Sequence, residues 1–83
     1  PLAILLIAAD PDALHAVRTQ AATLVGPVEA DYRELASAEP EAMLAAAHAA
    51  RASALVVGLS DRLSPASIEL LRNRLRCPAV LVK

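Results

Sequence analysis

The sequence predicts an α/β fold: a three-layer open parallel sheet of four strands, flanked by helices. Three observations predict it. Apolar runs of strand length alternate with stretches of helical spacing. Asp-Pro and Ser-Pro pairs, which often start helices, follow two of the apolar runs. The 83 residues, 57% of them hydrophobic, are enough for one small domain. We therefore expect the order β-α-β-α-β-α-β with right-handed crossovers, in a single domain over 1–83 or a piece of a longer one.

The first strand and helix are expected over 2–9 and 11–25. "LAILLIAA" is a continuous apolar run, typical of a strand that is buried on both faces. Asp10 supplies a helix cap, and a proline and an acidic residue follow in the first turn. Helical spacing then predicts a buried stripe of Leu14, Val17, Ala21, Leu24 and Val25.

The second strand and helix are expected over 28–35 and 40–52. Apolar and charged residues alternate in "VEADYREL", as in a half-exposed strand at the edge of a sheet. Pro40 lies near the first turn of the helix. Its expected buried side consists of Met43, Leu44, Ala47 and Ala50.

The remaining elements are a buried strand over 54–58, a helix that starts at Ser64-Pro65, and a last strand over 79–82. The helix has an inner face of Ile68, Leu71 and Leu75, and Pro78 ends it. Placing the edge strand beside the first strand gives the expected strand order 2-1-3-4.

The last strand is then an apolar edge. Unpaired strand edges invite pairing with another strand. We therefore expect either a homodimer through Ala79, Val80, Leu81 and Val82, or a missing neighbour from elsewhere in a longer parent chain.

Composition excludes several classes of partner. Tyr32 is the only aromatic residue, so the chain lacks the stacking surfaces of single-strand nucleic-acid binders. No apolar run reaches the roughly 20 residues of a membrane span, so we expect no membrane insertion. Cys77 is the only cysteine, which excludes an internal disulfide and fits a reducing, cytoplasmic location.

Charge is unevenly distributed, although the net charge is only −1. Acidic residues dominate 1–50, and basic residues dominate 51–83. Arg72, Arg74 and Arg76 lie close together. They form either a patch for phosphate or another anion, or simply a solvated helix face.

No catalytic motif is present, and we expect no enzyme activity. The chain has two glycines, too few for a Gly-rich phosphate loop. One cysteine and two distant histidines give no metal-ligand spacing. His15 and His48 are expected to be exposed on helices, so neither a catalytic residue nor a metal or other cofactor is expected.

One place could still hold a nucleotide. Open parallel sheets bind ligands beyond the carboxyl ends of their strands. There the candidates are Asp10, Gly58, Ser60 and Asp61. Ser60 and the amides at the start of the third helix could bind phosphate, but Asp61 adds negative charge, and Asp10 has an alternative role as a helix cap.

The segment "ASALVVGLS…RCPAVLVK" resembles the C-terminal half of universal stress protein (UspA-like) domains, in which an apolar strand ends in Gly and Cys-Pro precedes a last apolar strand. The likeness covers 54–83 well, and the family has five strands where four are expected here. Nucleotide-binding members carry Gly-x2-Gly-x9-Gly-Ser/Thr. Gly58 matches the first glycine, Asp61 stands at the second, and no later Gly-Ser follows. The resemblance therefore implies a member that does not bind ATP and acts through dimerisation or protein contacts. Such domains also occur fused to membrane transporters and kinases.

Two alternatives remain open. One is a nucleotide-binding stress protein with a degenerate phosphate loop. The other is a pseudo-receiver, because "ILLIAADPDALHAVRTQA" also resembles the start of a response-regulator receiver. Gly58 then stands where the phosphoaccepting Asp belongs, so phosphotransfer is not expected.

Overall fold

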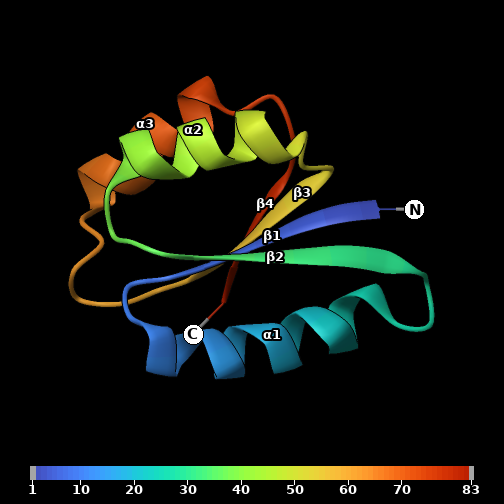
Figure 1. Ribbon diagram of the computed structural model, residues 1–83. Coiled ribbons are helices and arrows are strands. Elements are labelled where there is room, and N and C mark those ends of the chain that lie inside the picture. Colours follow the sequence, from blue (N-terminus) through green and yellow to red (C-terminus); the bar gives the residue numbers. More distant parts are fainter. Residues whose placement is uncertain (1, 83) are drawn as a thin grey trace.

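A computed structural model describes residues 2–82 and confirms the predicted fold class. The elements are β1 (Leu2–Ala8), α1 (Pro11–Val25), β2 (Ala30–Ala36), α2 (Pro40–Ala50), β3 (Ala54–Gly58), α3 (Pro65–Arg74) and β4 (Ala79–Val82) (Figure 1). All neighbouring strands pair in parallel, in the order β2-β1-β3-β4. This is the order expected from the sequence.

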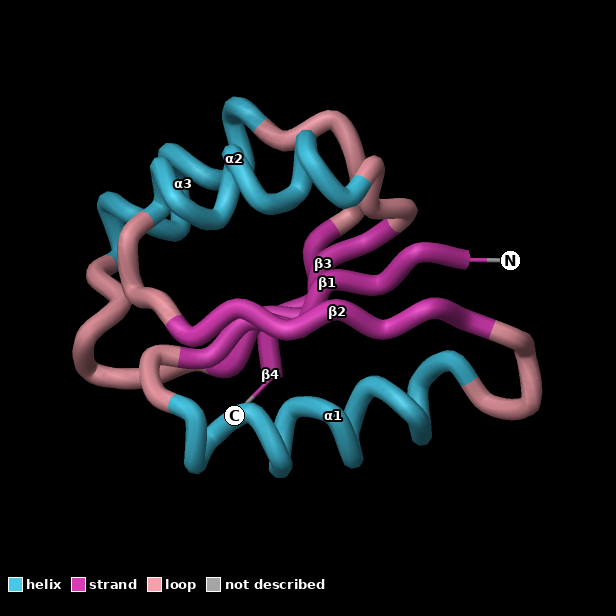
Figure 2. Tube along the Cα trace, in the orientation of Figure 1, coloured by secondary structure: helices cyan, strands magenta, loops and turns pink. Residues whose placement is uncertain are grey.

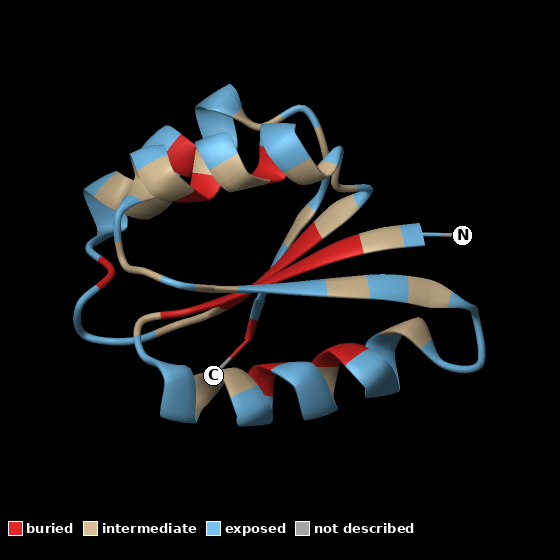
Figure 3. Cartoon of the chain, viewed as in Figure 1, coloured by how far each residue is buried: buried red, intermediate tan, exposed pale blue. Residues whose placement is uncertain are grey.

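The helices form the two outer layers. Helix α1 covers one face of the sheet, and α2 and α3 lie side by side on the other (Figure 2). Buried residues are concentrated on β1 and β3 and on the inward sides of the helices (Figure 3). The central strands therefore contribute to both cores, as their continuous apolar runs predict.

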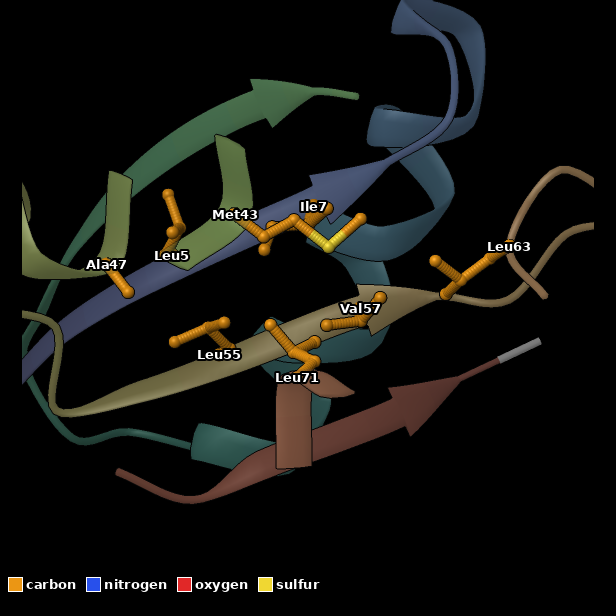
Figure 4. Packing of buried hydrophobic residues seen from close by; sticks show 8 residues of the cluster. All are labelled: Leu5, Ile7, Met43, Ala47, Leu55, Val57, Leu63 and Leu71. Atoms are coloured by element: carbon orange, nitrogen blue, oxygen red, sulfur yellow. The ribbon is translucent and has the colours of Figure 1, made fainter. Parts of the chain in front are cut away.

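The larger core lies between the sheet and the pair α2 and α3. Figure 4 shows Met43 of α2 over Ile7, and Leu71 of α3 beside Leu55. The buried residues of this cluster are Leu5, Ile7, Met43, Ala47, Leu55, Val57, Leu63 and Leu71. Small alanine side chains in this cluster, such as Ala47 and Ala46, let α2 approach the strands closely.

The smaller core lies under α1. It contains Ile4, Leu6, Ala8, Val17, Ala21, Val56 and Val82. The predicted stripe on α1 is confirmed at Val17 and Ala21 but is wrong at Leu24, which is 60% exposed. At the last turn of α1 the inward position is occupied by Val25, one residue further on.

Local chemistry explains where the helices begin and end. The Asp10 carboxylate accepts a hydrogen bond of 3.0 Å from the amide of Ala13, and Ser64 caps α3 in the same way. Helix α2 ends at Ala50, before the expected boundary. Arg51 takes left-handed backbone angles, φ 49° and ψ 48°, at which only glycine is free of strain.

Candidate functional site

The four nucleotide-site candidates do come to one end of the sheet. Strands β1 and β3 are parallel neighbours, with Ile7 opposite Val57. Asp10 follows β1, and Ser60 and Asp61 follow β3. The loops that follow β1 and β3 therefore lie together at the carboxyl ends of these strands, where the nucleotide crevice is expected.

Three polar side chains of this region, those of Asp10, Ser60 and Ser64, already have local hydrogen-bond partners. Asp10 is engaged as the cap of α1. The Ser60 hydroxyl accepts a hydrogen bond of 3.3 Å from the amide of Arg62, and the Ser60 carbonyl accepts one of 3.1 Å from Leu63. The Ser64 hydroxyl caps α3. At the start of α3, Pro65 has no N–H group, and the amides of Ser67 and Ile68 already donate to the hydroxyl and the carbonyl of Ser64.

Gly58 has a packing role in this region. A Cβ atom at this position would lie 2.7 Å from Cγ2 of Val17, a buried residue of α1. The glycine lets α1 pack closely against the end of β3. Its presence is therefore explained without a phosphate.

Two cavities lie elsewhere, one between the C-terminal ends of α2 and α3 and one between α3 and β4, and neither is lined by any of the four candidates. Asp61 is exposed in the loop. Nucleotide binding at this end of the sheet stays a prediction.

The edge of β4 is the second candidate site. The amides of Leu55 and Leu59 donate to the carbonyls of Pro78 and Val82, at 2.9 and 2.7 Å. In a parallel strand every second residue bonds to the same neighbour. Ala79 and Leu81 therefore direct their N–H and C=O groups away from β3, to an edge with no further strand among residues 2–82.

The side chains of β4 separate into two kinds. Val80 and Leu81 are each 39% exposed, although both are apolar. Val82 is only 9% exposed and packs into the core under α1. Of the four expected interface residues, Val82 therefore contributes to the interior of its own chain.

A groove of about 610 Å³ runs between α3 and this edge. The sequence did not predict it, because its two walls come from different elements. Its apolar walls include Ile68, Leu71 and Leu75 of the α3 segment and Ala79 and Leu81 of β4, and Arg72 also lines it.

Cys77 borders both the cavity between α2 and α3 and the groove between α3 and β4. Partial burial raises the pKa of its thiol above the ordinary value, and a hydrogen bond with its own backbone lowers it by less. The thiol is consequently protonated near neutral pH, and a protonated thiol is a poor nucleophile. Cys77 therefore serves as a wall residue of the cavity and the groove, and its thiol is not a candidate nucleophile.

The opposite edge of the sheet is different. Strand β2 is longer than β4, and it carries exposed charges at Asp31, Arg33 and Glu34. Arg18 of α1 bonds to Glu34 at 3.2 Å and lies over the ring of Tyr32. Charged side chains on an edge oppose pairing with a further strand. Of the two sheet edges formed by residues 2–82, only that of β4 is both unpaired and apolar.

Residues 2–82 contain no group of three or more metal-ligating side chains and no helix with the length and apolar character of a membrane span. Neither a scan against protein-family models nor searches of curated proteins and of solved structures find a match to the chain. The resemblance to universal stress proteins therefore rests on the quoted residues alone.

Proposed function

We propose that the chain is a non-catalytic binding module of universal-stress-protein-like type that acts through protein contacts, and that its partner is a second copy joined through β4. The observation that carries the proposal is the open edge of β4. Ala79 and Leu81 direct unpaired backbone groups outward, and the exposed Val80 lies between them.

The positions of these groups define one symmetric pairing. In an antiparallel pair of β4 strands, Ala79 of each copy lies opposite Leu81 of the other, which forms about four hydrogen bonds across a two-fold axis. The small Ala79 leaves room for the partner's larger Leu81 beside the groove. Val80 of one chain faces Val80 of the other across the two-fold axis. Both sheets then join into one, and neither apolar edge remains open.

The same pairing gives the apolar groove an occupant. Its wall residues Ile68 and Leu75 pack on the same face of the sheet as Ala79, which is the face on which the partner's Leu81 would lie. Removing such aliphatic surface from water contributes about 25 cal/mol per Å². The groove therefore adds hydrophobic stabilisation to the hydrogen bonds of the edge.

A disulfide across the axis tests this geometry. In the proposed pairing, Val80 and Val80 of the other copy face each other without hydrogen bonds between them. The Cα atoms of such a pair in an antiparallel sheet lie about 4.5 Å apart, within the range that a disulfide spans. The variant Val80→Cys with Cys77→Ser is expected to form a covalent dimer rapidly under mild oxidation. The product is measured by non-reducing electrophoresis and mass spectrometry.

Leu24→Cys with Cys77→Ser is the matched control, because Leu24 is also exposed but lies on α1. It is expected to cross-link only slowly, by random collision. Equal rates for the two variants would contradict the proposed pairing.

A further inference from the structure

We infer that the cavity between the C-terminal ends of α2 and α3 binds a small phosphate monoester. It has a volume of about 270 Å³ and is formed by the turns after α2 and α3. This is the end of the sheet opposite to Asp10 and Gly58. The inference is independent of pairing through β4.

The cavity is lined by basic side chains. Arg51, Arg74, Arg76 and His48 all border it. Of the three arginines only Arg74 has a carboxylate partner among residues 2–82, a bond of 3.0 Å to Glu41. Two guanidinium groups are therefore left without an acidic partner beside the same hollow.

Helix dipoles explain only part of this charge. Each helix C-terminus carries roughly half a negative charge. Two such ends and Glu41 together offset about two of the three arginine charges, so a surplus of about one positive charge remains before His48 is counted. A dianionic group would find both this surplus and a set of guanidinium donors. Arginine forks bind phosphate oxygens through paired, charge-assisted hydrogen bonds.

Arg51 gives independent support. It is the one non-glycine residue with a positive φ among residues 2–82. Glycine or asparagine is usual at this place after a helix, because other residues adopt the left-handed conformation only at a cost. What arginine adds over glycine here is a guanidinium group at the cavity. Strain of this kind is often kept at binding sites.

The remaining walls indicate the rest of the ligand. Leu44 and Leu75 line the cavity beside the basic groups. An apolar surface next to an anion site suits a phosphate that carries a short apolar body. We therefore choose phenyl phosphate as the probe, and inorganic phosphate and phenol as its two halves.

Amide chemical shifts in ¹⁵N-labelled protein locate the binding, and calorimetry measures the dissociation constant. Phenyl phosphate is expected to shift residues 51–52 and 74–77 in a saturable way that added salt weakens. Inorganic phosphate is expected to act at the same residues more weakly, and phenol to have little effect.

Arg51→Gly and Arg76→Gln are each expected to weaken binding about tenfold, through loss of charge-assisted hydrogen bonds. Glycine favours the backbone conformation of residue 51, so Arg51→Gly keeps the fold intact. Arg62→Gln is the control, because Arg62 is exposed at the other end of the sheet.

Three results would overturn the inference: no saturable shift, unchanged affinity in both cavity variants, or shifts confined to residues 10 and 58–61. The last result would assign the anion to the predicted nucleotide crevice instead. The oligomeric mass of the same samples is measured separately, so failure here leaves the proposal for β4 untouched.

Discussion

The substitution Val80→Lys is expected to convert the proposed dimer into monomers. In the proposed pairing Val80 faces its own copy on the two-fold axis, so Val80→Lys places two like charges directly opposite each other. Juxtaposed like charges at an interface cost several kcal/mol, and we expect the dissociation constant to rise about 100-fold or more. Sedimentation velocity over a range of protein concentrations measures the change.

The fold of the single chain is expected to survive this change. Val80 is 39% exposed in one chain, so its lysine reaches water without disturbing the core, and circular dichroism checks this. Leu24→Lys makes a similar change on α1 and is expected to leave the proposed dimer intact. A Val80→Lys protein that is still dimeric would show that another surface holds the copies together.

Alanine at Gly58 is expected to destabilise the fold by about 1–2 kcal/mol. Overpacking of a core costs about 1–3 kcal/mol, and replacing glycine in a strand returns roughly 0.5–1. The added methyl group would meet Val17, which is 3% exposed and β-branched, so it has little rotamer freedom in the helix. Urea denaturation measures the free energy of unfolding.

The partner variant distinguishes packing from any other role of Gly58. Val17→Ala removes the methyl group that the new Cβ would meet. In the double variant the loss is expected to be about 1–2 kcal/mol smaller than the sum of the two single losses. Additive losses would mean that the contact with Val17 is not the reason for the glycine.

The fold could be predicted because several local signals agree. The apolar runs at 54–58 and 79–82 are strands, the run at 2–9 is a strand as far as Ala8, and Asp10 and Ser64 cap helices as expected. The order 2-1-3-4 followed from the half-polar character of the second strand. Sequence periodicity could not decide which residue of the last turn of α1 points toward the sheet, because Leu24 and Val25 both fit the apolar stripe.

The sites were less accessible to prediction because they depend on contacts between distant segments. The packing role of Gly58 involves Val17, which belongs to another element. The basic cavity brings the turn at Arg51 next to the turn at Arg76. The close spacing of Arg72, Arg74 and Arg76 was a partial signal. It did not reveal that Arg72 borders the groove at β4 while its neighbours border the cavity.

The central claim, association through β4, is tested most directly by the molar mass of the unmodified chain in solution. Light scattering at several protein concentrations, with and without magnesium ATP, makes the measurement. The proposal predicts twice the chain mass of 8.6 kDa, unchanged by the nucleotide. A mass of one chain at every concentration would contradict it, and a mass that changes with ATP would favour the nucleotide-binding alternative.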